Sequence, residues 1–278
     1  MPFCLDDSPY FKMIELSEAD STNSFLANYQ TRQPIDIILA TADYQSAGRG
    51  QTGNTWESAR GQNLLFSILV HPTSLLASQL FIISEAIALS LSESVTECLS
   101  SDAANLDKEL DVKVKWPNDI YINDSKVAGI LIETELQGQY VKRAIIGVGL
   151  NVNQLRFESD APNPVSLRQL SGHTYERSFI LSSIMGRFKQ YYTQVLAGTY
   201  APIHAAYRQA LYRGETQTLW PFQDQNGPFM AGIAHVEPDG HLVLLDSTGR
   251  QRRYAFKEVS FILQTPARPE PPTLGPPA

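Results

Sequence analysis

The sequence predicts an α+β fold, with a main domain of strands and helices followed by a small β-rich domain. Three short apolar runs follow one another between Lys115 and Asn151, which is typical of neighbouring β strands. Apolar residues recur at helical spacing in two long segments, Leu80 to Leu99 and Phe179 to Leu196. Further along the chain, short β-like runs are separated by the turn sequences EPDGH and DSTGR. These last runs predict a small barrel.

The first half of the chain alternates between helix, strand and loop patterns. Ser21 to Gln30 reads as a helix that opens on an Asp20/Ser21 cap, and Ile35 to Tyr44 as a buried strand. Gln45 to Arg60 is polar and glycine-rich, and it is too long for a plain connector. Loops of this length are usually functional or disordered. Leu64 to Pro72 is then expected to form another strand.

The second half supplies a hairpin, a short helix and the barrel. Lys115 and Lys126 bracket the expected hairpin, and Ala201 to Tyr212 reads as a short helix that precedes four short β-like runs. The last 15 residues contain six prolines and almost nothing to bury, so we expect a disordered tail. The predicted organisation is a main domain over 1–212, a small domain over 213–263 and a tail over 264–278.

Composition favours a soluble, cytoplasmic enzyme. The 278 residues are 43% hydrophobic, enough for one sizeable core, and no apolar stretch is long enough to span a bilayer. Residues 1–10 lack the basic region of a secretory signal. Two cysteines cannot form a disulfide framework, and the five histidines show no metal-ligand spacing. With a net charge of −7, binding to nucleic acid is not expected either.

Six motifs carry the functional signal, and their order matters as much as their content. They read STN from Ser21, YQ from Tyr44, GRGQTGNTW from Gly48, KWPND from Lys115, SKVAGIL from Ser125 and GVGLNVN from Gly147. Together they resemble the biotin protein ligases over roughly residues 14–263. The resemblance implies a mixed or antiparallel sheet with flanking helices and an SH3-like C-terminal domain. Only about a dozen residues precede Ile14, so we expect no DNA-binding repressor module.

The resemblance also implies a reaction in two steps. Such a ligase activates biotin with ATP as biotinyl-5′-adenylate and then transfers it to a lysine of a biotin carboxyl carrier protein or carboxylase domain. Lys126 lies where the family places the lysine that bridges the substrate carboxylate and the phosphate. Arg49 is suited to a bidentate grip on phosphate or carboxylate oxygens. Both are the predicted catalytic residues, with Mg²⁺ held beside the triphosphate by Asp119.

Residue by residue, the motif match predicts the two binding sites. The biotin-binding residues are expected to be Ser21, Thr22, Asn23, Gln45, Gly48, Arg49, Gly50, Gln51, Lys126, Gly129 and Gly147, with the two last glycines leaving room along the pocket wall. The ATP-binding residues are expected to be Lys115, Asn118, Asp119, Asn151 and Trp56. Two of these have open alternatives. Lys115 either contacts phosphate or only caps its strand, and Trp56 either packs the loop over the ligand or is simply core.

Several questions stay open at this level. A lipoate or octanoate ligase of the same fold and a non-catalytic biotin-sensing protein are the alternative functions. The chain could be a monomer or a homodimer. Gln51 and Thr52 stand where the best-known members carry further arginines, which leaves less positive charge around the adenylate. Lys257 and Glu258 receive no assigned role.

Overall fold

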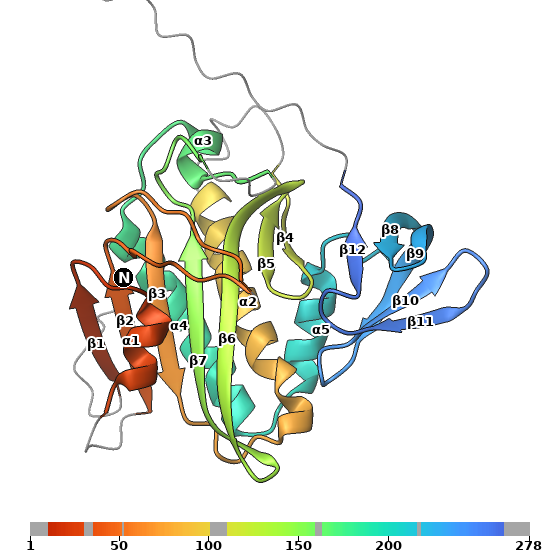
Figure 1. Ribbon diagram of the computed structural model, residues 1–278, viewed down its shortest axis with the longest axis horizontal. Coiled ribbons are helices and arrows are strands. Elements are labelled where there is room, and N and C mark those ends of the chain that lie inside the picture. The colour runs from red at the N-terminus through yellow and green to blue at the C-terminus, as the bar shows by residue number, and fades with distance from the viewer. Residues whose placement is uncertain are drawn as a thin grey trace, which may run out of the picture.

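A seven-stranded mixed sheet forms the centre of the protein (Figure 1). The computed structural model describes residues 11–30, 36–51, 53–100, 110–158, 163–215 and 218–263. The strand order is β1-β2-β3-β7-β6-β5-β4, and β1 pairs with β2 in parallel while the other neighbours are antiparallel. The strands are β1 (Phe11–Leu16), β2 (Ile37–Ala42), β3 (Leu64–Val70), β4 (Val112–Lys115), β5 (Asp119–Ile122), β6 (Ser125–Gln137) and β7 (Tyr140–Leu150). The mixed sheet expected from the resemblance is therefore confirmed.

Helices cover both faces of this sheet. They are α1 (Thr22–Asn28), the 3₁₀ turn η1 (Ala77–Gln79), α2 (Phe81–Ser100), α3 (Leu167–Ser171), α4 (Arg177–Leu196) and α5 (Ala201–Ala210). No helix in the described ranges is both long and apolar enough to cross a membrane. The long amphipathic helices and the strand after the glycine-rich loop agree with the sequence patterns within a few residues. Strand β1 and helix α3 were not predicted.

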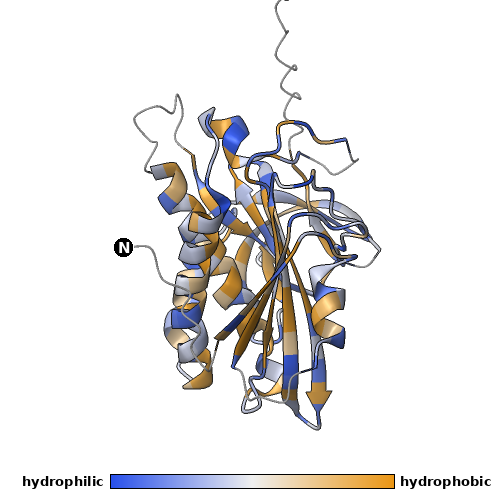
Figure 2. Ribbon diagram, turned by 90° about the vertical axis from the view of Figure 1, so that its left-hand side faces the viewer, coloured by the Kyte–Doolittle hydropathy of each residue, from blue (hydrophilic) through white to orange (hydrophobic). Residues whose placement is uncertain are grey.

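Alternation along the strands divides the interior into two layers. On β2, Ile37 and Leu39 join the large core beneath α2 and α4, whereas Ile38 and Ala40 pack with Leu26 of α1 on the opposite face. Successive strand side chains point to opposite faces, so both layers arise from one apolar sequence. The strands accordingly appear mainly apolar in Figure 2. The thin α1 layer leaves part of its sheet face free for a binding site.

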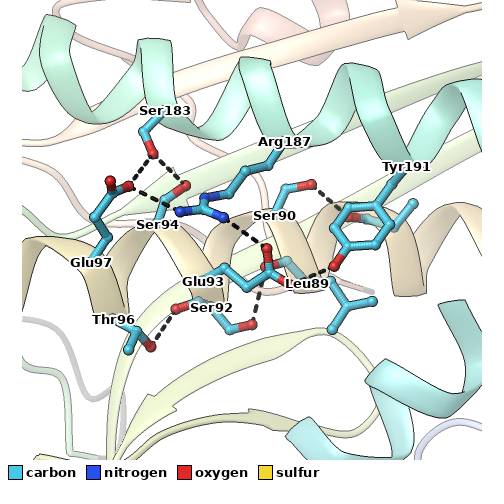
Figure 3. A network of polar contacts seen from close by, with 11 residues as sticks. Leu89, Ser90, Ser92, Glu93, Ser94, Thr96, Glu97, Ser183, Arg187 and Tyr191 are labelled. Atoms are coloured by element: carbon cyan, nitrogen blue, oxygen red, sulfur yellow. Dashed lines mark hydrogen bonds and ion pairs between the residues drawn. The ribbon is translucent and has the colours of Figure 1, made fainter. Parts of the chain in front are cut away.

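A polar network joins the two long helices of the main core (Figure 3). Arg187 of α4 lies between two carboxylates of α2, with its Nη1 3.1 Å from Glu93 and its Nη2 3.1 Å from Glu97. Ser183 donates to Glu97 at 2.8 Å, and the hydroxyl of Tyr191 donates to Glu93. These contacts fix how the helices lie along each other, while the apolar side chains beneath them provide the packing.

One carboxyl group is buried within the same helical layer. Glu85 of α2 is 2% exposed, and its Oε2 lies 2.7 Å from Nδ1 of His204 on α5. Burial raises the pKa of Glu85 from 4.5 to about 7, although the charge of His204 opposes the change. Because the folded chain holds this proton more tightly than the unfolded chain, the stability contribution is full below about 4.5 and is lost as the pH rises through 7.

We therefore expect Glu85→Gln to flatten the pH dependence of stability. Between pH 5 and pH 8 the wild-type free energy of unfolding should fall relative to the variant, by an amount on the order of 3 kcal/mol. Urea denaturation of both proteins at each pH measures the difference. Parallel stability curves for the two proteins would show that Glu85 does not titrate in this window.

A second sheet packs against one end of the first. It is antiparallel with the order β11-β10-β9-β8-β12. Its strands are β8 (Trp220–Asp224), β9 (Gly227–Val236), β10 (Leu242–Asp246), β11 (Gln251–Tyr254) and β12 (Val259–Phe261). The prediction of four runs was one strand short, because β12 spans only three residues and has little pattern of its own. The predicted tail, 264–278, lies outside the described residues.

The KWPND segment joins the two sheets. Nε1 of Trp116 donates to the carbonyl of Gly240 at 2.9 Å, and its ring meets that of Phe256 edge-on, with centroids 5.4 Å apart. Gly240 has a φ of +93°, and a Cβ there would press against Phe81. A glycine is thus required where the β9–β10 turn meets the main domain.

Candidate active site

A cavity opens on the α1 side of the main sheet, next to the free part of that face. The register explains its position: Gly129 pairs with Gly149, Leu131 pairs with Gly147, and Ser67 pairs with Gly147 from the other side. The free volume inside the cavity is about 50 Å³. Its walls come from Ser21, Thr22, Asn23, Gln45, Arg49, Gly50, Gln51, Trp56, Asn118, Asp119, Lys126, Gly129, Ile130, Leu131, Gly147, Val148 and Gly149.

Hydrogen-bonding side chains form the floor of this cavity. The backbone N–H of Thr22 donates to Oε1 of Gln45 at 2.7 Å. The Thr22 hydroxyl lies 2.6 Å from Oγ of Ser67 and 3.1 Å from Oε1 of Gln45. Ser67 in turn donates to Oδ1 of Asn23 at 2.6 Å. Ser21 is the N-cap of α1, but its side chain makes no capping bond, so the STN motif is more than a helix cap.

Three glycines on β6 and β7 allow side chains to lie directly on the sheet. A Cβ at Gly147 would overlap the amide of Asn23, and a Cβ at Gly149 would overlap the indole of Trp56. At Gly129 it would come within 2.9 Å of the same indole. The room that these glycines leave is therefore occupied by Asn23 and Trp56. Nε1 of Trp56 is buried without a hydrogen-bond partner.

Two cations face the cavity, and each is paired with a carboxylate. Nη2 of Arg49 lies 2.7 Å from Oε1 of Glu133, and its Nη1 lies 3.3 Å from Oε2, which is the bidentate geometry that arginine favours. Nζ of Lys126 lies 2.7 Å from Oδ1 of Asp119 and 5.7 Å from the centre of the Trp56 ring. Each positive charge at the cavity is thus balanced by the negative charge of its carboxylate partner.

Two predicted ATP contacts do not lie in the cavity wall. Lys115 lies between the two sheets, where its Nζ donates to the Tyr121 hydroxyl at 3.1 Å and lies 5.4 Å from the ring centre of Phe261. Burial lowers the pKa of Lys115. The Asn151 amide is buried and donates to the carbonyl of Val165 at 3.1 Å. These positions favour structural roles for both residues.

Asn118 and Asp119 both line the cavity, but the side chain of Asn118 is bonded to the backbone whereas that of Asp119 is paired with a cation of the site. The Asn118 amide donates to the carbonyl of Ile130, and the N–H of Ile130 donates back to the Asn118 carbonyl at 2.9 Å. Asn118 therefore fixes the turn between β4 and β5. Asp119 presents its carboxylate to the cavity through the ion pair with Lys126.

Comparison with known proteins places the chain in a family. The model of the biotin/lipoate A/B protein ligase family matches residues 16–151, the range that contains the cavity. The chain belongs to this family. The 22% identical biotin protein ligase from Aquifex aeolicus in complex with biotin and ATP has the same fold, with a TM-score of 0.70 over 91% of this chain and 99% of that one.

Two curated members of the biotin/lipoate ligase family illustrate the similarity in sequence. The bifunctional ligase/repressor BirA of Bacillus subtilis is 28% identical over 245 residues, which cover 86% of this chain and 70% of that protein. The biotin--[acetyl-CoA-carboxylase] ligase of Paracoccus denitrificans is 29% identical over 214 residues, with 74% of this chain and 83% of that protein covered.

Three residues at the site were not named among the predicted site residues, although Gly149 belongs to the GVGLNVN motif. They are Ser67, Glu133 and Gly149. Ser67 is the one polar residue in the apolar run of β3, and Gly149 repeats the two-residue alternation that begins at Gly147. Glu133 follows Gly129 and Leu131 on the same face of β6. The alternation of residues along each strand could therefore have indicated which side chains share the cavity face. Only the strand pairing, however, shows that all three residues lie together.

Proposed function

We propose that this chain is a biotin protein ligase that adenylates biotin with ATP and passes the biotinyl group to a lysine of a biotin carboxyl carrier protein or carboxylase domain. The observation that carries the proposal is the polarity of the cavity. The floor of hydroxyl and amide groups lies where Asn23 covers Gly147, with Arg49 joined to it through Glu133, and the ion pair of Lys126 and Asp119 lies further along the sheet, beside Gly129. Biotin is divided in the same way, with a ureido ring at one end and a carboxylate at the other.

The floor suits the ureido ring because it offers both acceptors and donors. The ring has two N–H groups and one carbonyl, and it is otherwise apolar. Thr22, Asn23 and Gln45 present hydroxyl and amide groups within a small area. Ser21, Gly50 and Gln51 complete the proposed biotin site from the helix start and the loop. Gly48 is also assigned to it, and it lies next to the wall, where a Cβ would overlap the carbonyl of Trp56.

Lys126 is the residue best placed to assist adenylation. Its ammonium lies beside Gly129, one strand-pair step along the sheet from Gly147 and the Asn23 amide of the floor, where the carboxylate of biotin would arrive. A cation there brings the carboxylate and the α-phosphate together and stabilises the charge that builds on phosphorus. The biotin carboxylate oxygen attacks that phosphorus, and pyrophosphate leaves. Arg49 supports the same anions from the loop side.

Asp119 provides the carboxylate that a magnesium ion beside the triphosphate requires. Mg²⁺ in nucleotide sites typically binds one or two carboxylates together with phosphates and water, and Asp119 faces the cavity with a side chain that is 20% exposed. When bound, the ion supplies charge neutralisation for the leaving pyrophosphate. Exchange of Asp119 from Lys126 to the metal would free the ammonium for the substrate anions.

Transfer then needs little from the protein beyond positioning. The amine of the acceptor lysine attacks the activated carbonyl, an amide bond forms, and AMP leaves. The loop from Gly48 to Trp56 borders the cavity, and Trp56 already covers Gly129 and Gly149 there. This loop can keep water away from the mixed anhydride until the acceptor arrives. We assign catalysis to a main domain over 1–212 and carry 213–263 as a separate small domain.

The polar floor also separates biotin from lipoate or octanoate. Those acids end in a dithiolane or an alkyl chain and have no N–H donors to offer to Thr22 and Gln45. Buried polar groups left without partners cost about 1–3 kcal/mol each, so such a floor discriminates against an apolar head group. We therefore expect a strong preference for biotin.

Incubation with labelled biotin, MgATP and a biotin carboxyl carrier domain tests the proposal. Mass analysis should show one biotinyl group on the carrier lysine, and the same reaction with lipoate or octanoate should leave the carrier unmodified. Biotin binding without ATP consumption would instead indicate a non-catalytic biotin sensor. Modification by lipoate at a comparable rate would move the chain to the other branch of the family.

Ligand binding should also protect the glycine-rich loop. Gly53 and Gly61 have positive φ values, and backbone bonds such as Trp56 N–H to Gly48 O at 3.0 Å hold the loop on itself. Such a loop rearranges at low cost. We expect trypsin to cleave after Arg49 and Arg60 more slowly once biotin and MgATP are added. Equal cleavage with and without the ligands would show that the loop does not close over them.

A further inference from the structure

Glu133 connects the glycine-rich loop to the floor of the cavity through hydrogen bonds to Arg49 and Asn23. It does not line the cavity, and none of the motifs that predict the site assigns it a role. Its Oε2 accepts a hydrogen bond from Nδ2 of Asn23 at 2.8 Å, and its two oxygens accept from both terminal nitrogens of Arg49. One carboxylate on β6 thus holds a residue of α1 and a residue of the glycine-rich loop.

This carboxylate also sets the direction of the hydrogen bonds in the floor. An ionised carboxylate can only accept, so the Asn23 amide must turn its Nδ2 toward Glu133 and its Oδ1 toward Ser67. Ser67 has a single proton, and it goes to that Oδ1 at 2.6 Å. The Thr22 hydroxyl has one proton and two acceptors within reach, Oγ of Ser67 at 2.6 Å and Oε1 of Gln45 at 3.1 Å, and the shorter contact with Ser67 takes it.

The consequence appears at the far end of this chain of hydrogen bonds. With its proton committed to Ser67, the Thr22 oxygen presents only lone pairs to the cavity. Oε1 of Gln45 lies 3.1 Å away and is also an acceptor, since it takes the Thr22 backbone N–H. Two acceptor oxygens therefore lie side by side without a proton between them. Such a pair favours a ligand with an N–H group and disfavours one with a carbonyl at that point.

We propose that Glu133 is a positioning residue that fixes the polarity of the floor for the N–H side of a cyclic urea, and that it does so through Asn23, Ser67 and Thr22. The proposal rests on biotin being the substrate. Glu133 also pairs with Arg49, which the proposed function places on the substrate anions, so the effect that marks this positioning role is the one on biotin affinity measured without ATP.

The test compares Glu133→Gln with Glu135→Gln. Glutamine keeps the shape of the side chain, but it can donate hydrogen bonds as well as accept them. The direction of the hydrogen bonds from Thr22 through Ser67 to Asn23 is then no longer fixed. Glu135 is a matched control, because it lies two residues further along the same strand and pairs with Lys142 at 2.6 Å, outside the cavity wall. We expect Glu133→Gln to raise the Kd for biotin, measured without ATP, about tenfold. Glu135→Gln should match the wild type.

A double variant separates polarity from simple disturbance. In Asn23→Asp combined with Glu133→Gln, the acceptor-only group moves to position 23, where it accepts from Ser67 and from the new amide. The direction from Thr22 to Ser67 is thereby retained, and biotin affinity should recover relative to Glu133→Gln alone. Equal biotin affinity of wild type and Glu133→Gln, or no recovery in the double variant, would overturn the proposal. A wild-type protein that does not bind biotin in calorimetry would instead refute the proposed function itself.

Discussion

Replacing Lys126 with alanine should slow biotin adenylation about a hundredfold or more. An ammonium that bridges two approaching anions acts mainly on the transition state, and its loss typically costs on the order of 3 kcal/mol in the barrier. The KM for ATP should change much less. Biotin-dependent exchange of labelled pyrophosphate into ATP isolates this first step. Lys126→Arg should restore only part of the rate, because a planar fork does not reproduce a compact point charge.

A second lysine provides the control for this experiment. Lys113 of β4 pairs with Asp111 at 3.6 Å and does not line the cavity, so Lys113→Ala removes a similar ion pair elsewhere on the sheet. Partly exposed pairs contribute at most about 1 kcal/mol, so both alanine variants should remain folded. If Lys126→Ala exchanges pyrophosphate at the rate of Lys113→Ala, Lys126 is not the bridging cation.

Adding one methyl group at Gly147 should weaken biotin binding about thirtyfold. A Cβ there overlaps the amide of Asn23, and that amide cannot swing aside without giving up its bonds to Ser67 and Glu133. Disruption of this network costs at least about 2 kcal/mol, which corresponds to that change in Kd. Isothermal titration with biotin measures it, and thermal denaturation confirms that the variant folds.

The neighbouring positions show whether Asn23 transmits the effect. Combining Gly147→Ala with Asn23→Ala removes the overlap, so the double variant should bind biotin no more weakly than Asn23→Ala alone. Gly149→Ala lies on the same face of β7 but overlaps Trp56 instead, and it should alter indole fluorescence more than biotin affinity. Additive losses in the double variant would mean that Gly147 contacts the ligand itself.

Elements with a strong periodic pattern were predictable from the sequence. The helices near Leu80 and Phe179 and the strand after Leu64 appear within a few residues of their expected bounds. Shorter elements were missed, because a few residues give too little periodicity to recognise. Strand β1 also lacks a clean pattern, since it alternates between exposed and partly buried positions.

The site was predictable where one local motif supplied the chemistry. Lys126, Arg49 and Thr22 come from segments far apart in the sequence, and the structure brings them to one cavity. Ser67 was not predictable, because its role depends on which residue of β7 lies opposite it, and that register is set by the whole sheet. Lys115 was ambiguous in the sequence, since a lysine at a strand end looks the same whether it faces a ligand or a second domain.

The contact of Trp116 with Gly240 has a consequence for any attempt to shorten the protein. Trp116 is 4% exposed because the second sheet covers it, yet Asn118 and Asp119, only two and three residues later, form part of the cavity wall. The turn between β4 and β5 therefore contacts the second sheet through Trp116 and lines the cavity of the main sheet through Asn118 and Asp119. A minimal enzyme could not be made by cutting the chain after the main sheet alone, because the cut would expose an indole next to the residues that must stay in register for catalysis.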